Sequence, residues 1–283
     1  MLWNSKELEV ITGGHSIKPF TVNGVSIDTR TLQPNDLFVA LTVKRDGHDF
    51  VLEALKKGAS GVLVSKIPEG VSSECPLLLV NEVKRALDLI GIASRARSHA
   101  KIVAITGSVG KTSTKEMLKK SLSKHCLVHV SQKSYNNQWG VPLSLANMPE
   151  NTEVAVFEIG MKSPGEILPL TRMIRPHLAI ITAVTTAHLE SFCSVDEIAK
   201  EKASILEGLE ENGLGIVNCD FESLDKALSL YSSVKLITFG KSVEADWRLS
   251  NIKFSNTNMI CSLTSNIYDF DFTINTLGEH HAI

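Results

Sequence analysis

Short apolar runs alternate with helix-like segments along the amino-terminal third of the chain. Three of these runs have the length and the continuous apolar character of buried strands: Leu37–Leu41, Gly61–Val64 and Leu77–Val80. The segments Phe50–Lys57 and Val83–Arg97 instead repeat apolar residues at the spacing of a helix. The alternation predicts a small α/β domain over residues 1–98, and a basic, polar stretch at residues 95–101 marks its boundary.

From Lys101 onward the pattern predicts a second, larger α/β domain over residues 99–283. Ile102–Thr106 is an apolar run, and it is followed by a predicted helix whose apolar side carries Met117, Leu118 and Leu122. Further buried-strand candidates are Val154–Ile159, Leu178–Val184, Gly215–Asn218 and Leu236–Phe239. Continuous apolar strands between helices are typical of a mostly parallel sheet flanked by helices on both faces.

The pattern changes again past Ala245. Segments such as Trp247–Phe254 and Met259–Thr264 alternate apolar with polar residues, which is the period of a strand with one buried face. We therefore expect antiparallel strands in this last part of the chain.

The composition narrows the class of protein. The 283 residues carry 29 basic and 31 acidic side chains, and 43% of them are hydrophobic, as in a folded globular protein. The near-neutral charge argues against nucleic-acid partners, and the longest apolar stretches are too short to cross a bilayer. The five cysteines are scattered and odd in number, which indicates reduced thiols in the cytoplasm. We expect a monomer without a membrane partner.

The strongest chemical signal is a glycine-rich loop between the strand at 102–106 and the following helix. It comprises Thr106, Gly107, Ser108, Val109, Gly110, Lys111, Thr112 and Ser113. Glycines let backbone N–H groups approach phosphate, the helix start adds positive charge, the lysine serves the terminal phosphates, and Thr112 can ligate magnesium. The spacing departs from the common phosphate-loop motif because Ile stands at position 105. A turn without a ligand is the alternative, but the strand–turn–helix context favours a P-loop-type domain that binds a nucleoside triphosphate.

Two further polar residues lie at, or shortly after, the ends of predicted strands. Glu158 lies at the end of the strand 154–159, at the sheet edge that carries the loop, where a carboxylate could hold magnesium. A solvated strand-end glutamate is the alternative. His188 follows the strand 178–184 and is expected at the same edge, although magnesium prefers oxygen ligands and a lone histidine is often structural.

A lysine falls on the predicted buried face of the next helix. The sequence Ser194–Glu197 fits a capping box, so we expect the helix to begin near Val195. Its apolar stripe includes Ile198, and Lys202 lies on that stripe whereas Lys200 points away from it. Lys202 either reaches into the site as a carboxylated or ion-paired lysine, or extends its stem to the surface.

Taken together, these segments resemble the Mur ligases, the ATP-dependent amide-forming enzymes of peptidoglycan synthesis. The motifs that carry the resemblance are residues 106–118, 136–142, 158–160 and 187–190, with 26–30 and 46–50 in the first domain. The resemblance implies a UDP-substrate-binding domain at 1–98 and an ATP-binding domain at 99–283. It also implies a carboxy-terminal amine-binding domain that these residues do not include, so that this chain alone would be inactive as a ligase.

The resemblance also assigns roles to individual residues. Lys111 would bind the terminal phosphates of ATP, and Mg²⁺ would be held by Thr112 and Glu158. His188 would ligate a second metal ion, Lys202 would be carboxylated by CO₂, and His280 would contact the nucleotide. Substrate contacts are implied for Thr29, Arg30, Asp46, Gly47, His48, Asn136 and Asn137. Ordinary turn chemistry is the alternative for these three loops.

Within the family, the motifs are most similar to the branch that joins D-alanyl-D-alanine to UDP-N-acetylmuramoyl-tripeptide. The implied reaction passes through an acyl phosphate. A branch that adds a different residue, a folylpolyglutamate-type ligase, and a non-catalytic module that binds nucleotide or UDP-sugar remain alternatives.

Overall fold

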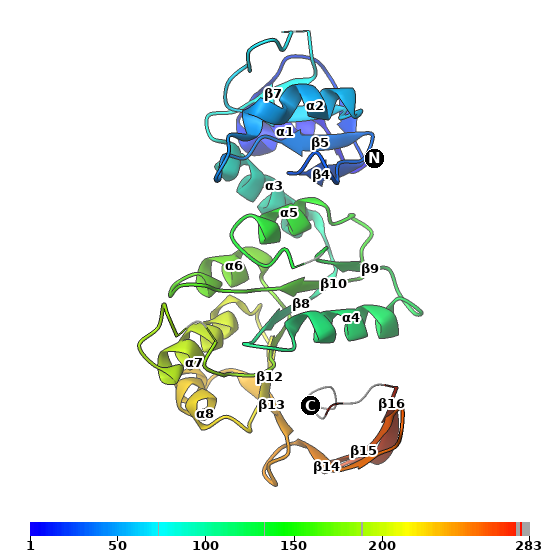
Figure 1. Cartoon of the computed structure of the whole chain (residues 1–283), viewed down its shortest axis with the longest axis vertical. Coiled ribbons are helices and arrows are strands. Elements are labelled where there is room, and N and C mark those ends of the chain that lie inside the picture. Colours follow the sequence, from blue (N-terminus) through cyan, green and yellow to red (C-terminus); the bar gives the residue numbers. More distant parts are fainter. Residues whose placement is uncertain (73, 133, 188, 276–277, 279–283) are drawn as a thin grey trace. The chain divides into compact units, whose positions relative to one another are not determined.

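The computed structural model describes residues 1–72, 74–132, 134–187, 189–275 and 278, and its internal contacts divide the chain into two units. The first unit comprises Met1–Ala100 and Ser131–Glu153, and the second comprises Lys101–Val130 and Val154–Ile283 (Figure 1). The sequence pattern assigned residues 131–153 to the second domain, whereas these contacts group them with the first.

The first unit is a small α/β fold. Its described strands are β1 (Trp3–Asn4), β2 (His15–Ser16), β3 (Thr21–Val22), β4 (Gly24–Ser26), β5 (Asp36–Val39), β6 (Gly61–Val64) and β7 (Leu77–Leu79). Its described helices are α1 (Ser5–Thr12), the 3₁₀ helix η1 (Gly47–Phe50), α2 (Val51–Lys56), α3 (Val83–Arg97) and α5 (Gly140–Ala146). The main sheet has the order β2-β7-β6-β5-β4 and is parallel except at β2, while β1 pairs with β3.

Specific hydrogen bonds join residues 131–153 to the first unit. The indole N–H of Trp3 donates to the carbonyl oxygen of Ala146 at 2.8 Å, in the buried core. The side-chain amide of Asn147 pairs with the backbone N–H and the carbonyl of Val25, both at 2.8 Å. These long-range contacts were not readable from hydrophobic periodicity, which explains why the pattern missed them.

The second unit is built on one long sheet. Its described strands are β8 (Lys101–Thr106), β9 (Val128–Val130), β10 (Val154–Glu158), β11 (Leu178–Ile181), β12 (Leu214–Asn218), β13 (Lys235–Gly240), β14 (Trp247–Phe254), β15 (Met259–Ser265) and β16 (Asp269–Ile274). The sheet order is β16-β15-β14-β13-β12-β11-β8-β10-β9. Pairing is parallel from β9 to β14 and antiparallel across β14, β15 and β16. The predicted mostly parallel sheet with antiparallel strands at its end is therefore confirmed.

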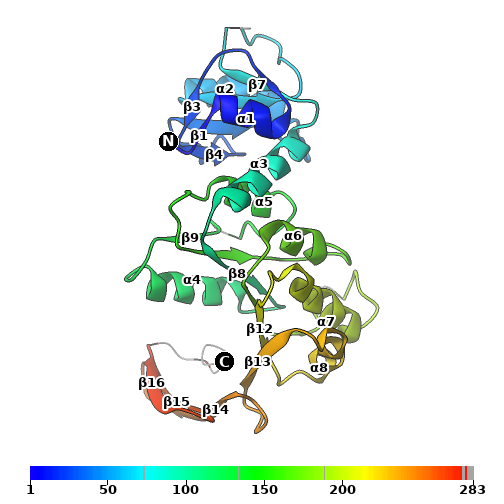
Figure 2. The ribbon, with the colours of Figure 1, turned by 180° about the vertical axis from the view of Figure 1, so that it is seen from behind.

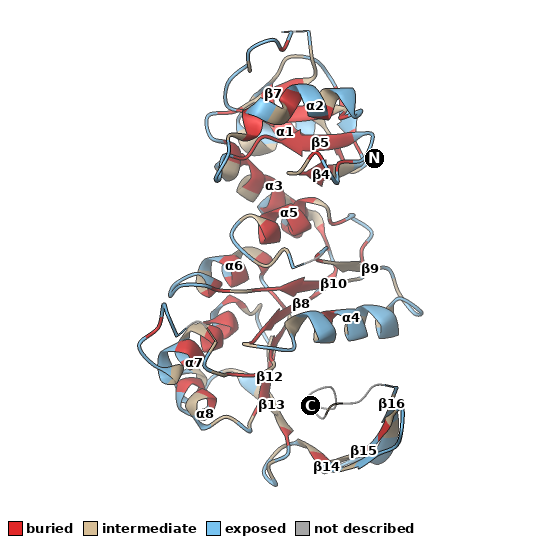
Figure 3. Ribbon diagram, viewed as in Figure 1, coloured by how far each residue is buried: buried red, intermediate tan, exposed pale blue. Residues whose placement is uncertain are grey.

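Helices cover both faces of the parallel strands. The described helices are α4 (Lys111–Leu122), α6 (Ile167–Ile174), α7 (Val195–Ala203), η2 (Ser204–Gly208), α8 (Glu222–Leu228) and η3 (Ser229–Tyr231). Figures 1 and 2 show α4 on one side of β8 and β10 and α6 on the other. Figure 3 shows that β8 and β10 are buried between these layers while the outer face of α4 is exposed. Among the described residues, no helix is long and apolar enough to cross a membrane.

The carboxyl ends of three neighbouring strands are aligned at one edge. Glu158 of β10 is in register with Ile105 of β8, and Thr106 of β8 is in register with Ile181 of β11. The chain moves from β8 to one side through β9 and β10, and then to the other side through β11. In open α/β sheets such a switch in direction leaves a crevice for ligands outside the carboxyl ends of the strands. We therefore expect a ligand site at the residues just after Thr106, Glu158 and Ile181.

One detail of the helix predicted after the glycine-rich loop is wrong. Met117 was expected on the apolar side but is 46% exposed. Leu118 packs on the core of the sheet, and the inner stripe of α4 also includes the buried Lys115. The buried face of α4 therefore includes a lysine, which a search for apolar periodicity does not detect.

Candidate functional site

The glycine-rich loop forms the turn from β8 into α4. Gly107 and Gly110 have φ angles of +151° and +88°, which favour glycine. A Cβ on Gly107 would lie 2.0 Å from the Thr182 hydroxyl oxygen, so a side chain has no room there. Among the described residues, no side chain caps the amino terminus of α4. The first-turn N–H groups of this helix are thus available to an anion.

The loop is anchored to the end of β11. The Thr182 hydroxyl lies 2.5 Å from the carbonyl oxygen of Val109 and 3.2 Å from that of Thr106. Ser108 donates its N–H to the Ala183 carbonyl oxygen at 2.8 Å and accepts from the Thr185 N–H at 2.9 Å. These bonds hold the loop backbone in place without using the helix amino terminus.

A buried carboxylate faces the first turns of α4. Glu158 is fully buried, and its Oε2 accepts a hydrogen bond from the Thr112 hydroxyl at 3.2 Å. Its Oε1 lies 3.1 Å from the Nζ of Lys115, which is also buried. The sequence prediction that Glu158 lies beside the loop agrees with this geometry, and the alternative of a solvated glutamate is excluded. A buried carboxylate beside a phosphate loop is costly unless charges compensate it.

The loop lysine folds back on its own backbone. Lys111 Nζ donates to the carbonyl oxygens of Gly107 and Ser108. Burial lowers the pKa of Lys111, and the charge of Glu158 opposes that shift. An ammonium held by carbonyl dipoles over the loop is available to a phosphate that enters the site.

Lys202 lies on the buried face of α7, as predicted. It is 2% exposed, whereas Lys200 on the same helix is exposed. Ser194 caps the helix by accepting the Glu197 N–H at 3.2 Å, but the Glu197 carboxylate accepts from the N–H of Cys193, not from that of Ser194. The predicted capping box is thus half formed, and the helix begins at Val195 as expected.

The environment of Lys202 favours its neutral amine. Burial and, to a lesser degree, the nearby charge of Lys111 lower the pKa of Lys202 to about 7, against a smaller opposing effect of Glu201. Glu201 accepts the N–H groups of Gly165 and Ile167, both at 2.9 Å, and so fixes this part of α7 at the start of α6. Within the described part of the chain, the Lys202 amine has no hydrogen-bond or ion-pair partner. A buried, neutral amine is the form of lysine that reacts with CO₂.

In the first unit, the predicted loop at 46–48 forms a closed polar network. Asp46 Oδ1 accepts the His48 N–H at 3.0 Å and lies 2.6 Å from His48 Nδ1, while Lys66 donates to Oδ2 at 2.9 Å. The Ser65 N–H donates to His48 Nε2 at 3.0 Å, so the neutral histidine carries its proton on Nδ1. Gly47 sits against the backbone of Ala40 and Leu41, where a Cβ would lie 2.5 Å from both. These contacts match the turn alternative.

The residues at 28–30 are also internally paired. Arg30 Nη2 donates to Asp28 Oδ2 at 2.6 Å, and this hydrogen bond and charge raise the pKa of Arg30, with a smaller contribution from Tyr135. Thr29 is buried, and its carbonyl oxygen accepts from Lys57 Nζ at 2.9 Å. The side chain of Arg30 is 84% exposed, so its outer face is open to an anion.

Asn136 and Asn137 lie in the segment 131–153, which contacts group with the first unit. Asn137 Oδ1 accepts the N–H groups of Trp139 and Gly140, at 3.2 and 2.9 Å, just before α5. This is the turn chemistry considered for the pair. Tyr135 stands next to Asn136 in sequence and is close enough to Arg30 to affect its pKa.

Two predicted residues cannot be placed. His188 and His280 lie outside the described residues. Within the described ranges there is also no group of three or more His, Cys, Asp or Glu side chains suited to a metal ion.

Most of the second unit matches a known protein family. Residues 105–283 match the model of the Mur ligase middle domain. The chain belongs to the Mur ligase family. A UDP-N-acetylmuramoyl-tripeptide–D-alanyl-D-alanine ligase of Rickettsia prowazekii is 36% identical over 285 residues, covering 100% of this chain and 63% of the relative.

Solved structures agree. MurF from Acinetobacter baumannii matches with a TM-score of 0.86 at 26% identity, covering 99% of this chain and 62% of that one. MurF from Thermotoga maritima, solved in complex with ADP, matches with a TM-score of 0.78 at 26% identity, covering 92% and 60%. This Mur ligase chain thus spans less than two thirds of the length of these relatives.

The residues of this Mur ligase site fit a magnesium–nucleotide complex. Thr112 Oγ1 and Glu158 Oε2 are hard oxygen donors 3.2 Å apart. Neighbouring ligands of an octahedral ion with bonds of about 2.0–2.1 Å are about 2.9 Å apart, so a small inward movement would suit Mg²⁺. The buried hydroxyl of Thr106 has no hydrogen-bond partner among the described residues, which marks another polar group at this edge that awaits one.

Sequence reasoning missed Lys115 and Thr182 in this Mur ligase site. Lys115 lies four residues after Lys111, on the inner stripe of α4, and the same periodicity that selected Lys202 could have found it. Thr182 lies inside the predicted strand 178–184, just after the observed end of β11 at Ile181, and carries no signal in the sequence alone. Only the register of β11 with β8 places it under the loop.

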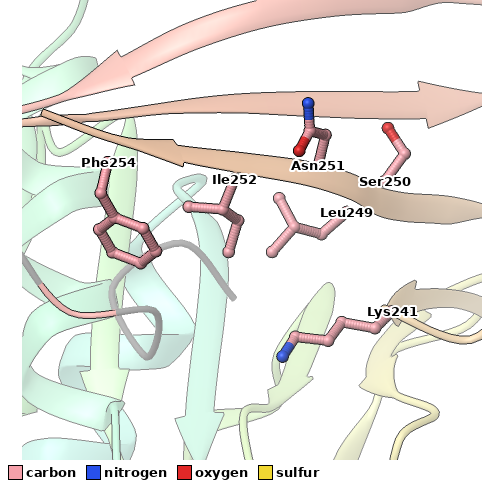
Figure 4. A pocket seen from close by; sticks show the side chains of 6 residues that line it. All are labelled: Lys241, Leu249, Ser250, Asn251, Ile252 and Phe254. Atoms are coloured by element: carbon pink, nitrogen blue, oxygen red, sulfur yellow. The ribbon is translucent and has the colours of Figure 1, made fainter.

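A hollow of about 320 Å³ lies elsewhere in the second unit, beside β14. Figure 4 shows Leu249, Ile252 and Phe254 directed toward the same space as Lys241. The β14–β15 register shifts between Leu249 and Asn251, which explains why Leu249 and Ile252 share a face. This hollow is lined by none of the predicted site residues.

Proposed function

We propose that this chain carries the ATP and UDP-substrate sites of a ligase that joins D-alanyl-D-alanine to UDP-N-acetylmuramoyl-tripeptide. The proposal rests above all on one observation: the buried carboxylate of Glu158 accepts a hydrogen bond from the Thr112 hydroxyl, beside a glycine-rich loop and Lys111. It is supported by relatives whose names state this reaction, at 32–36% identity.

In the proposed reaction, the tripeptide carboxylate attacks the γ-phosphorus of ATP, which forms an acyl phosphate and releases ADP. The amine of D-alanyl-D-alanine then attacks the acyl carbon, and phosphate leaves as the amide bond forms. Such transfers depend mainly on positioning and on neutralising charge.

The residues of the second unit divide this work. Lys111 would leave the carbonyl oxygens of Gly107 and Ser108 to contact the terminal phosphates. The uncapped start of α4 would bind phosphate oxygens through its N–H groups. Thr112 and Glu158 would hold Mg²⁺, which when bound screens the charge of the phosphates. His188 is proposed as a ligand of a second metal ion.

Lys202 is proposed to act as a carbamate. Its neutral amine would add to CO₂, forming an N–C bond and releasing one proton. The product carries a negative charge, which attracts the Lys111 ammonium, whereas the protonated form of Lys202 is repelled by it. The low pKa and the lack of a described partner support this assignment.

The first unit is proposed to bind the uridine diphosphate part of the substrate. Arg30 offers an exposed guanidinium, a suitable partner for a diphosphate. Thr29, the loop at 46–48, and Asn136 and Asn137 complete the proposed contacts, and His280 is proposed to contact the nucleotide in the second unit. We propose a cytoplasmic monomer, in keeping with five free cysteines.

Calorimetry on the 283-residue chain tests the proposal. We expect ATP to bind only with Mg²⁺, and UDP-N-acetylmuramoyl-tripeptide to bind more tightly than the corresponding dipeptide substrate. A preference for the dipeptide would instead indicate the ligase that adds the third residue. Failure to bind either nucleotide would reject the proposal. In the complete reaction, phosphate release should need ATP, Mg²⁺, the tripeptide substrate and D-alanyl-D-alanine together.

A further inference from the structure

Lys115 is a buried cation that the proposed chemistry does not use. It is 1% exposed and lies one helical turn after Lys111 on α4. Burying an ammonium is unfavourable unless an opposite charge accompanies it. Its buried neighbour of opposite charge is Glu158, and Glu116, with its exposed side chain, lies 3.3 Å from the same nitrogen.

The two oxygens of Glu158 have different neighbours. Oε2 accepts from the Thr112 hydroxyl at 3.2 Å, on the side of the phosphate loop. Oε1 lies 3.1 Å from Lys115 Nζ. The geometry between Lys115 Nζ and Glu158 Oε1 does not meet the criteria of a hydrogen bond, so the two groups interact as a close ion pair. The ammonium thus stands at one oxygen and leaves the other next to the threonine.

We propose that Lys115 is a positioning residue that restricts Glu158 to coordination through Oε2 alone and thereby makes the site select Mg²⁺ over Ca²⁺. This inference rests on the proposed nucleotide site. Mg²⁺ needs nearly ideal octahedral geometry, which the narrow bite of a two-oxygen carboxylate does not suit, whereas Ca²⁺ accepts carboxylates through one or both oxygens. A cation next to Oε1 repels a metal ion that would span both oxygens.

The proposal differs from a purely structural ion pair in what it predicts. If Lys115 only balanced the charge of Glu158, its removal would lower stability and change the affinity for both metal–nucleotide complexes in proportion. If Lys115 directs coordination, its removal changes the ratio between the two complexes. The ratio is therefore the decisive quantity, and it does not depend on enzymatic turnover.

The experiment compares the dissociation constants of Mg·ADP and Ca·ADP, measured by calorimetry on the 283-residue chain. In Lys115→Met, the affinity for Ca·ADP relative to Mg·ADP should rise by roughly threefold or more, because Glu158 can then bind through both oxygens. Lys115→Arg keeps the positive charge and should hold the ratio within roughly twofold of the original. Lys119→Met removes an exposed lysine of the same helix and serves as the matched control, with an unchanged ratio.

Thermal unfolding without ligand checks that the variants fold. If Lys115→Met does not fold, Lys115→Gln replaces it, with the same expected rise in the ratio. An unchanged ratio in a folded Lys115→Met or Lys115→Gln variant would overturn the inference and leave the proposed function standing. Absence of metal-dependent ADP binding by the unsubstituted chain would overturn both.

Discussion

Two polar clusters of this molecule show how differently a fold can treat charge. At the phosphate loop, Glu158, Lys115 and Lys202 are each at most 2% exposed. In the first unit, Asp46 and Lys66 pair near the surface, with side chains that are 31% and 63% exposed. The first cluster buries charges at a cost, while the second pairs its charges near the surface, between the 46–48 loop and residues 65–66.

The pKa values of Asp46 and Lys202 are both lowered, but the two shifts have opposite consequences for the charged form of each group. The hydrogen bond from Lys66, followed by those from the backbone and ring of His48, holds the pKa of Asp46 well below its usual range. Burial lowers the pKa of Lys202 to about 7. For an acid, a lowered pKa means that the charged form is stabilised, and for a lysine it means that the charged form is destabilised. Lys202 therefore does not stabilise the fold through its charge, and we infer that its role is a functional one.

The largest effect should come from the loop lysine. Lys111→Met removes the cation expected to bind the terminal phosphates, and should weaken ATP binding with Mg²⁺ by about 10- to 100-fold, the value of hydrogen bonds to a charged group. Calorimetry measures this loss. If Lys111→Met bound ATP as tightly as the original chain, the buried cluster would not be a nucleotide site.

A smaller loss is expected from the loop backbone. Gly107→Ala places a Cβ against the Thr182 hydroxyl oxygen and requires a positive φ of an alanine, so the loop must shift. Affinity for ATP should fall roughly tenfold. Adding Thr182→Ala removes the clash but also the anchor of the loop, so the double variant should lose less than the sum of the single variants. Strict additivity would show that the two residues do not interact.

The third prediction concerns the cost of burying Lys202. In CO₂-free buffer at pH 7, Lys202→Met should raise the free energy of unfolding by about 1–3 kcal/mol, because a buried cation is replaced by an apolar side chain. Between pH 7 and the ordinary lysine pKa of about 10.5, the unfolded chain binds one proton more than the folded chain. The stability of the original chain should therefore rise with pH in this window, and its difference from Lys202→Met should narrow.

Urea unfolding over this pH range supplies the measurement. Lys200→Met, on the exposed side of the same helix, is the control and should change stability little. Destabilisation by Lys202→Met at pH 7 would contradict the view that Lys202 is retained at a cost.

The smallest effect is expected at Asp46, near the surface of the first unit. Here the substitution should lower the free energy of unfolding, whereas Lys202→Met should raise it. Asp46→Asn weakens the cap of η1 and the contact with Lys66, so it should lower the free energy of unfolding by about 1 kcal/mol at pH 7. Because the folded pKa of Asp46 lies below the unfolded value, this contribution is complete above about pH 4 and is lost as the pH falls below it. Denaturant curves of both proteins at pH 7 and pH 3 should show the gap closing. A gap that widened in acid would refute the assignment of the stabilised charge to Asp46.

Much of the fold could be predicted from hydrophobic periodicity. The predicted β6 and β14 strands and the α3 helix have the observed bounds, since each combines a clear period with strong burial or clear ends. β9 has only three half-buried residues, and β16 is mostly exposed, so neither gives a strong apolar pattern. The assignment of residues 131–153 to the first unit depends on contacts such as Trp3 with Ala146, which no local pattern contains.

The candidate site was predictable where one element carried the signal. The loop motif and the buried position of Lys202 follow from a strand–turn–helix pattern and from a helical stripe. Lys115 was missed because apolar periodicity does not count a lysine and selects Met117 instead, which the structure exposes. Thr182 was missed because its role depends on the pairing of β11 with β8. Asn137 shows that a residue in a family motif also performs the turn chemistry of its own loop.

The most direct test of the central claim is the position of the metal in a crystal of this chain grown with ADP and Mn²⁺ in place of Mg²⁺. The account predicts an anomalous peak within bonding distance of Thr112 Oγ1 and Glu158 Oε2, with the phosphates of ADP at the amino terminus of α4. A metal and nucleotide bound away from these two side chains would contradict it.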